Sequence, residues 1–322
     1  MPQVIRRVLV FPVNGYVNRL QALASSAILA RHLGAPLQLC WTKFTLVPGP
    51  ATDTFSSEWC EQFAATEGGI EITLEQVPLY VAHDHDRAIV SLRGHDLGEQ
   101  ALMGTLRETL AGIHDPVDLV IVAGGSFDFA DPDASDGTWS EGFLASKMDF
   151  YRALPLHPFV ESTASTAVAS HPKGFLGLHL RYSDRSQQAP MPRAIQRALE
   201  LQAEQSGLSS VFIASDTDRA REKWSARVER MGLRPFDLTD SFTSLAAATS
   251  AGPAIADWRV LSQSRRLVHF AESSYAVEAS VAAGAWHESS ALPTSSVRAL
   301  AHRGWTLGKA GVTYPSRHWG SR

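Results

Sequence analysis

Cysteine is scarce in this chain of 322 residues, which contains only Cys40 and Cys60. Two cysteines this far apart match neither the spacing of a zinc site nor a disulfide framework. Cys40 stands in an apolar run, so we expect it to be a small buried hydrophobic residue. The low cysteine content agrees with a reducing compartment, and the cytoplasm is the expected location.

Long hydrophobic runs and a strong charge imbalance are also missing. No segment approaches the roughly 18 consecutive apolar residues of a membrane span. The opening MPQVIRRVLVFPV becomes strand-like too early for a secretory signal. The formal net charge of −4 gives no basic footprint for nucleic acid. We therefore expect neither a membrane nor a nucleic acid as partner, and the sequence does not indicate an oligomeric state.

Three common catalytic fingerprints are absent. The chain has no G-x-G-x-x-G turn, which argues against a nicotinamide enzyme, and no G-x-x-x-x-G-K-[ST] loop, which argues against a phosphate-loop NTPase. It has no G-x-S-x-G elbow either, which argues against an α/β-hydrolase. The function must be sought in less familiar clusters of polar residues.

The chain alternates between strand and helix patterns, which predicts an α/β fold with parallel sheets. In the first half, apolar runs at 8–13, 37–41 and 117–123 predict strands, and a helix is expected from about Asn18 to Leu33. In the second half, strands are expected at 175–180, 211–214, 234–238 and 266–270, with helices at 192–207, 219–231, 257–264 and 276–283. Prolines near 155 favour two Rossmann-like domains, 1–155 and 156–322, whose sheet edges face a cleft. The basic, aromatic tail at 303–322 is expected to be mobile or to pack back on the first domain.

The run His83-Asp84-His85-Asp86 could suggest a metal site. Successive residues of an extended chain point to opposite sides, so only alternate members converge, and no further ligand has suitable spacing. We therefore predict no metal site here and favour an exposed loop.

Polar clusters follow four of the predicted strands, at 15–19, 179–184, 215–218 and 273–274. The carboxyl ends of parallel strands share one sheet edge, where ligands of such folds bind. Strand alternation puts His179 and Arg181 on one side, which suits an anionic ligand with a polar ring, such as a nucleoside diphosphate. Plainer alternatives remain: Arg181 paired with Asp184, Asn18 as a helix cap, and Arg19 as a solvated side chain.

These clusters carry a resemblance to a known group of enzymes. Gly15-Tyr16-Val17-Asn18-Arg19-Leu20 resembles G-x-x-N-R-L, and His179-Leu180-Arg181-Tyr182-Ser183-Asp184 resembles H-x-R-R-x-D. The strand ending in Ser215-Asp216 and the stretch from Asp257 to Ser273-Ser274 complete the pattern. Together they resemble the GDP-fucose-type glycosyltransferase superfamily, which includes α1,6-fucosyltransferases, the nodulation-factor fucosyltransferase and protein O-fucosyltransferases. Residues 43–110 and the tail lie outside the resemblance.

The resemblance implies a GT-B fold and an inverting transfer from a GDP-sugar that needs no metal or other cofactor. It places His179 and Asp257 at the guanine, Arg181 with Ser273 or Ser274 at the β-phosphate, and Asn18 near the transferred sugar. We add two donor-binding candidates: Gly15, whose lack of a side chain allows close approach of a ligand, and Asp216 at its strand end. The catalytic candidates are Arg181, Asn18 and Asp184.

Two departures from the family pattern concern the acceptor. Tyr182 stands where a second arginine is usual, and residues 185–190 lack the glutamate that α1,6 enzymes carry there. A sugar hydroxyl benefits from a general base, whereas a thiolate needs less help. We therefore expect a small-molecule acceptor, such as a thiol in bacterial natural-product assembly (antibiotic biosynthesis, for example), with Asp184 and Asp216 as candidate bases. Alternatives are a fucosyltransferase acting on an oligosaccharide, a nucleotide-sugar-binding protein without turnover and, less favoured, a sugar-nucleotide-modifying enzyme.

Overall fold

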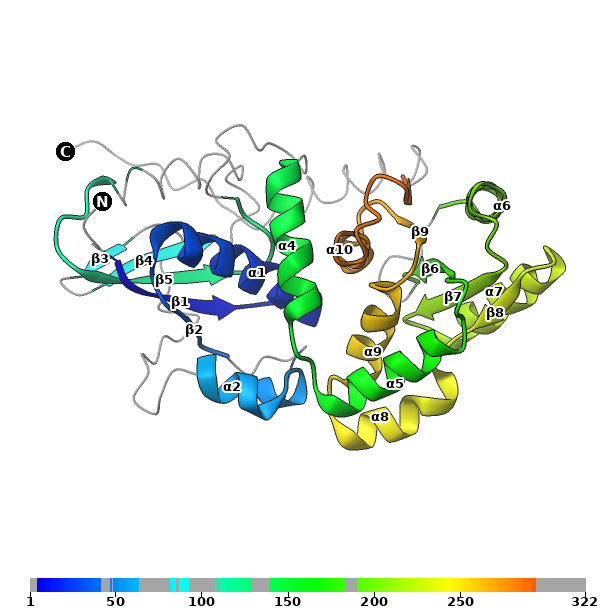
Figure 1. Cartoon of the computed structure of the whole chain (residues 1–322), viewed down its shortest axis with the longest axis horizontal. Helices are drawn as coiled ribbons and strands as arrows, with labels where there is room; N and C mark the ends of the chain where they lie inside the picture. Colours follow the sequence, from blue (N-terminus) through cyan, green and yellow to red (C-terminus); the bar gives the residue numbers. More distant parts are fainter. Residues whose placement is uncertain are drawn as a thin grey trace, which may run out of the picture.

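A computed structural model shows two α/β lobes side by side, each built on its own sheet of five strands (Figure 1). The structure describes residues 5–41, 47, 49–63, 82–84, 87–92, 108, 111–128, 139–182 and 190–293. Among these residues, no helix is both long and apolar enough to cross a membrane.

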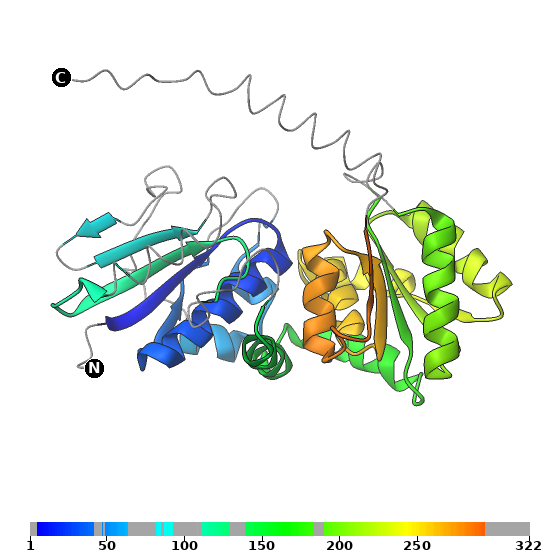
Figure 2. The ribbon, with the colours of Figure 1, turned by 90° about the horizontal axis from the view of Figure 1, so that it is seen from above.

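The first lobe has the sheet order β2-β1-β5-β4-β3, in which only β3 runs antiparallel to its neighbour. Helices α1 and α4 lie on the side of this sheet that meets the second lobe (Figure 2). The elements are β1 (Ile5–Pro12), α1 (Tyr16–Leu33), β2 (Leu37–Leu39), η1 (Ala51–Asp53), α2 (Ser57–Phe63), β3 (Ala82–Asp84), β4 (Arg87–Leu92), β5 (Val117–Ala123) and α4 (Glu141–Ala153).

Central strand β5 shows why this sequence forms a buried parallel strand. All seven residues of VDLVIVA are buried, as expected for a β-branched apolar run covered on both faces. The one charged member, Asp118, is accommodated because Arg7 on β1 donates to its carboxylate from Nε at 3.0 Å and Nη2 at 2.8 Å. The paired charges remove the penalty that an isolated buried carboxylate would carry.

The chain enters the second lobe between α4 and α5, and the second sheet is fully parallel in the order β10-β9-β6-β7-β8. Helix α5 packs on α9, which places it in this lobe. The elements are α5 (Pro158–Ala169), β6 (Leu176–Leu180), α6 (Pro192–Ser206), β7 (Ser210–Ser215), α7 (Asp218–Arg230), β8 (Arg234–Phe236), η3 (Thr239–Ser241), α8 (Phe242–Ala248), α9 (Gly252–Leu261), β9 (Arg266–Phe270), α10 (Ser274–Ala283) and β10 (Ser290–Leu292).

The two faces of the second sheet are covered by different helices. Helices α6 and α7 pack on one face around Trp224, and α5, α8, α9 and α10 pack on the other around Trp258. Gly252 opens α9 against α8, and a Cβ there would lie 2.5 Å from the Leu245 carbonyl oxygen. Only glycine allows α9 to begin this close to the backbone of α8.

The lobes meet where α10 packs against α1 and α4 (Figures 1 and 2). Here Glu278 of α10, 1% exposed, accepts hydrogen bonds from four residues of the first lobe. We call this group the interlobe cluster, and its first-lobe members are Gln21, Ser126, Lys147 and Tyr151. Because α10 also begins at the predicted donor site, the cluster fixes that site relative to the first lobe.

The structure corrects several local expectations. Helix α1 begins at Tyr16 and α9 at Gly252, both earlier than predicted, with Gly15 and Ala251 as the N-caps, so Asn18 does not cap α1. Strand β2 ends at Leu39, and Cys40 is half-buried rather than fully buried. His83 and Asp84 lie in β3 rather than in a loop, because β4 offers a pairing edge. Asp184 and the tail at 303–322 lie outside the described residues.

Candidate functional site

A cavity of about 320 Å³ opens at the carboxyl ends of β6 and β7, on the α8–α9 face of the second sheet. We call it the donor pocket. It brings together four of the residues singled out from the sequence, and strand and helix ends supply the rest of its wall. Its lining residues are His179, Arg181, Ala214, Ser215, Asp216, Arg221, Phe242, Pro253, Ala254, Asp257 and Tyr275.

His179 and Arg181 both face this pocket, as the alternation of β6 predicts. His179 is 6% exposed, and burial chiefly lowers its pKa to about 3. The imidazole is therefore neutral at physiological pH and offers one donor and one acceptor nitrogen. Its Nδ1 lies 3.4 Å from Ser273 Oγ, and its ring stacks on Tyr275 with centroids 4.9 Å apart. These two contacts fix the ring plane.

Asp257 is the most unusual group in the pocket. It is 6% exposed, and no described donor reaches its Oδ1, while its Oδ2 has only a long contact of 3.5 Å with Arg221 Nη2. Burial raises its pKa from 3.8 to about 8, with Arg221 opposing this shift and Asp237 adding to it. Buried polar atoms are nearly always paired in folded proteins. An orphaned carboxylate oxygen facing a cavity therefore suggests a ligand that donates hydrogen bonds.

Arg221 belongs to this site although it sits within α7. It is 4% exposed, donates to the Ser215 carbonyl at 2.7 Å and to Asp218 at 3.0 Å, and lies 4.6 Å from the centre of the Phe242 ring. These contacts anchor the guanidinium independently of Asp257. They explain how a single arginine can stand beside that carboxylate without fully neutralising it.

The amino end of α10 forms another wall of the site. Ser273 precedes the helix, is 2% exposed, and its side chain does not cap the helix. Ser274 is the first helical residue and is half-buried. The first N–H groups of a helix have no partner within it, and together with the helix dipole they favour an anion. Neither serine lines the donor pocket, although the next residue, Tyr275, does, so their predicted role at the phosphate stays a prediction.

Asp216 has a defined structural task. Its Oδ1 accepts a hydrogen bond from the backbone N–H of Tyr182 at 2.8 Å, which ties the end of β6 to the end of β7. This bond holds the segment that carries Arg181. Among the residues that the structure describes, no group of three His, Cys, Asp or Glu side chains could hold a metal ion.

The first-lobe candidates do not line the donor pocket. Gly15 is the N-cap of α1, and Asn18 donates from Nδ2 to the Gly124 carbonyl at 3.0 Å, so it ties α1 to the end of β5 instead of capping the helix. Arg19 is fully buried rather than solvated, because it lies 4.5 Å from the Trp41 ring centre and donates to the Asn14 carbonyl. Burial lowers its pKa to about 10.

Sequence reasoning missed Arg221, Phe242 and Tyr275. Arg221 is one of several charged residues in DRAREKWSARVER, a helix that resembles a solvated surface element. Only its position three residues after Asp218, directly beyond a strand end, could have drawn attention to it. Tyr275 follows the two serines at the start of α10, and the proximity of an aromatic ring to His179 could not be read from spacing alone.

Comparisons with known proteins match this geometry at the level of fold. No protein-family model matches the chain, and no curated protein matches it in sequence. Among solved structures, a mutant of Arabidopsis thaliana FUT1 in complex with GDP is 14% identical, with a TM-score of 0.58 over 87% of this chain and 69% of that one. Fucosyltransferase NodZ from Bradyrhizobium is also 14% identical, with a TM-score of 0.52 over 85% of this chain and 92% of that one.

The chain has the GT-B fold of these fucosyltransferases. The predicted α/β architecture of two Rossmann-like halves is confirmed. The fold that the sequence motifs implied, that of GDP-fucose-type glycosyltransferases, is confirmed as well. In this chain, the donor pocket lies at the carboxyl ends of strands of the second sheet.

Proposed function

We propose that this protein is a glycosyltransferase that takes its sugar from a GDP-sugar. The observation that carries the proposal is the orphaned carboxylate oxygen of Asp257, in the pocket that also holds His179 and Arg181. Guanine presents two adjacent N–H groups, one on the ring and one amino, which match the two oxygens of a carboxylate. Adenine offers an acceptor there instead. A site built to receive such donors rejects analogues that lack them by up to roughly 10⁴-fold.

The proposal also assigns partners to the phosphates. Arg181 can make a charge-assisted contact with the β-phosphate, alongside the hydroxyls of Ser273 and Ser274 and the first N–H groups of α10. As the bond between the sugar and the phosphate breaks, negative charge grows on GDP. Fixed donors aimed at that charge lower the barrier to reaction. The proposal assigns this task to Arg181 and the α10 amino end, without a metal ion.

The transfer itself inverts the sugar carbon. The acceptor nucleophile forms a bond to that carbon as the bond to the β-phosphate oxygen breaks, the electron pair leaves with GDP, and the acceptor loses its proton. Gly15 and Asn18 at the start of α1 belong to the lobe that would present the acceptor. Asp184 remains a candidate base by sequence, whereas Asp216 is better explained as a positioning residue because it holds the Tyr182 amide.

The acceptor is proposed to be a small molecule, such as a thiol in bacterial natural-product assembly. Its support is the missing glutamate at 185–190. The neighbouring folds suit the alternative equally well, because NodZ is named a fucosyltransferase. GDP release from GDP-fucose or GDP-mannose, measured with thiol acceptors and with oligosaccharides, separates the two. Transfer to oligosaccharides alone would overturn the small-molecule acceptor.

Ligand-induced thermal stabilisation tests the donor directly. A ligand that binds only the folded protein raises its melting temperature, so GDP should stabilise it more than UDP, ADP or dTDP. Arg181→Ala should remove most of the GDP-dependent shift, and Arg197→Ala, which changes an exposed arginine of α6, should leave it intact. Stabilisation by UDP or dTDP but not by GDP would refute the guanine assignment. Binding of GDP without turnover would favour a nucleotide-sugar-binding protein.

A further inference from the structure

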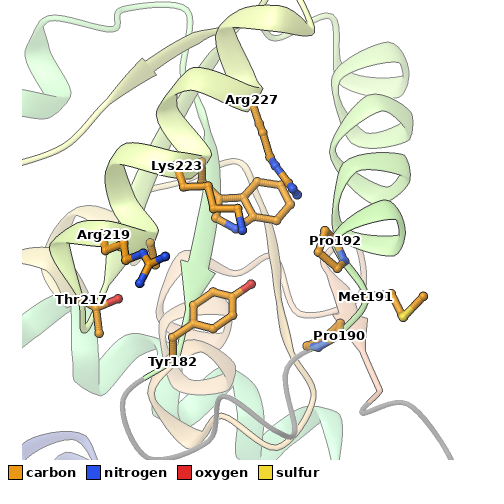
Figure 3. Close-up of a pocket in the computed structure, with 10 residues that line it drawn as sticks. Tyr182, Pro190, Met191, Pro192, Thr217, Arg219, Lys223 and Arg227 are labelled. Atoms are coloured by element: carbon orange, nitrogen blue, oxygen red, sulfur yellow. The ribbon is translucent and has the colours of Figure 1, made fainter.

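A second and larger cavity, of about 570 Å³, opens on the opposite face of the same sheet (Figure 3). It lies between the starts of α6 and α7, and we call it the α6–α7 pocket. Tyr182, Met191, Pro192, Arg219, Lys223 and Arg227 are among its lining residues. It shares no lining residue with the donor pocket, so it is a separate site.

Three cations stand along one side of this pocket. Arg219, Lys223 and Arg227 are spaced four residues apart on α7, so they share one face of the helix. In Figure 3 they reach toward the space between the two helices. Among the described residues, none of the three has a carboxylate partner within 4.0 Å, and the pocket lining contains no acidic side chain. Like charges at this spacing repel one another, and an anionic ligand would relieve that repulsion.

The helix ends add to the same electrostatic field. Met191 and Thr217 are the N-caps of α6 and α7, both line the pocket, and neither makes a side-chain capping bond. The amino ends of both helices therefore border the cavity, where the helix dipoles favour an anion.

The floor of the pocket is apolar. Trp224 lies beneath this floor and is 1% exposed, with the Arg227 guanidinium 5.0 Å from the centre of its ring, so the open apolar surface comes from other side chains. Met191 is 61% exposed and offers apolar surface at the mouth of the cavity. Tyr182 and two prolines complete this surface. A bare inorganic anion would leave it uncovered, whereas an aromatic group would bury it and stack against the arginine and tyrosine planes.

We propose that the α6–α7 pocket binds an organic anion in which a phosphate or carboxylate is joined to an aromatic group. The cations and helix ends hold the anionic part, and the apolar surface of Tyr182, Met191 and the two prolines receives the ring. This inference does not depend on the proposed transferase function, because it rests on residues outside the donor pocket.

Calorimetry with 1-naphthyl phosphate tests the site, with inorganic phosphate and 1-naphthol as half-ligands. The expected result is saturable binding of 1-naphthyl phosphate that is stronger than the binding of either half-ligand and is unchanged by saturating GDP. Lys223→Glu should weaken the binding at least tenfold, because Lys223 lies in the middle of the three cations. Arg230→Glu makes the same charge change on an exposed residue of α7 outside the pocket and should leave the affinity unchanged.

Three results would overturn the proposal. One is a lack of detectable binding at millimolar 1-naphthyl phosphate. Another is an equal loss of affinity in Lys223→Glu and Arg230→Glu, which would mean attraction by net charge alone. The third is displacement of the probe by GDP, which would place it in the donor pocket. Circular dichroism of both variants shows whether they are folded, and Lys223→Gln provides a milder change at the same position.

Discussion

Two buried carboxylates of the second lobe, Glu278 and Asp257, have opposite surroundings. In the interlobe cluster, Lys147 Nζ donates to Glu278 at 2.7 Å, Tyr151 at 2.6 Å and Gln21 at 2.9 Å. In the donor pocket, Asp257 has one long contact and one oxygen without a described donor. A fully paired carboxylate holds the structure together, and a half-paired one at a cavity is prepared for a ligand.

The same comparison applies to the cations beside them. Lys147 is completely buried, and desolvation lowers its pKa even though Glu278 opposes the shift. Removal of Glu278 would leave the Lys147 ammonium group buried without a counter-charge. Arg221 instead has Asp218 and the Ser215 carbonyl as further partners, so it does not depend on Asp257. The two carboxylates should therefore differ in what their replacement damages: stability in one case and ligand binding in the other.

Glu278→Ala should have the largest effect. Breaking a buried ion pair from one side costs about 3–5 kcal/mol, because the remaining charge is left buried without compensation. We expect a loss of this size in the free energy of unfolding measured with urea. The double variant Glu278→Leu/Lys147→Met, which removes both charges, should recover much of it. A single variant as stable as the wild type would contradict the role given to the interlobe cluster.

Asp257→Asn should not destabilise the protein and should abolish guanine recognition. With its pKa raised to about 8, Asp257 is largely protonated at neutral pH in the empty pocket, so a neutral amide is a close substitute. The amide nitrogen cannot accept an N–H, however, and the GDP affinity should fall about 100-fold, equivalent to ~2.7 kcal/mol. Calorimetry measures the affinity, and Asp240→Asn, at an exposed aspartate, is the matched control. Tight GDP binding by Asp257→Asn would break the comparison.

The pH dependence of GDP binding tests whether Asp257 titrates when the ligand binds. Guanine needs the ionised carboxylate, so GDP affinity should fall as pH drops below 8, by at most about tenfold per unit. The GDP affinity of Asp257→Asn should lack this dependence on pH. The phosphates of GDP titrate in the same way with both proteins, so their effect cancels when the two affinity profiles are subtracted. Isothermal titration from pH 6 to pH 9 measures it. Parallel profiles for the two proteins would mean that Asp257 does not titrate on binding.

The unfolding equilibrium gives an independent check of that raised pKa. The folded pKa of about 8 lies above the usual 3.8, so the folded state binds this proton more tightly. The contribution of Asp257 to stability is therefore fully present below about pH 4 and is lost as pH rises through 8. Wild type should lose stability relative to Asp257→Asn over that window.

The sequence predicted much of the donor pocket but not the interlobe cluster. The polar residues after the predicted strands pointed to His179, Arg181 and Asp216, because the carboxyl ends of parallel strands converge on one edge. Asp257 was singled out only by the family resemblance. The helix pattern gave it no special role, and it placed the start of the helix at Asp257, whereas α9 begins at Gly252. The orphaned oxygen could not have been foreseen, because it depends on how closely α9 approaches α7.

The interlobe cluster had no sequence signal. Lys147 and Glu278 are 131 residues apart in the sequence, and nothing in the pattern of either helix marks its charged residue for burial. Their burial arises only when α4 and α10 meet across the two lobes. Arg19 escaped detection for a similar reason, since its cover is Trp41 from beyond the next strand. Local patterns identify elements and strand ends, and long-range pairing decides which charges become buried.

Tyr275→Phe should have the smallest effect and tests how far the donor pocket is preformed. The hydroxyl of Tyr275 donates to the Ala254 carbonyl at 2.6 Å and ties α10 to α9, while its ring stacks on His179. Phenylalanine keeps the stacking and loses one hydrogen bond, worth about 1 kcal/mol. GDP affinity should therefore fall only several-fold, and Tyr275→Ala, which removes the ring as well, should weaken binding further. Equal losses in the two variants would mean that the α9–α10 link, and not the ring stacked on His179, shapes the guanine site.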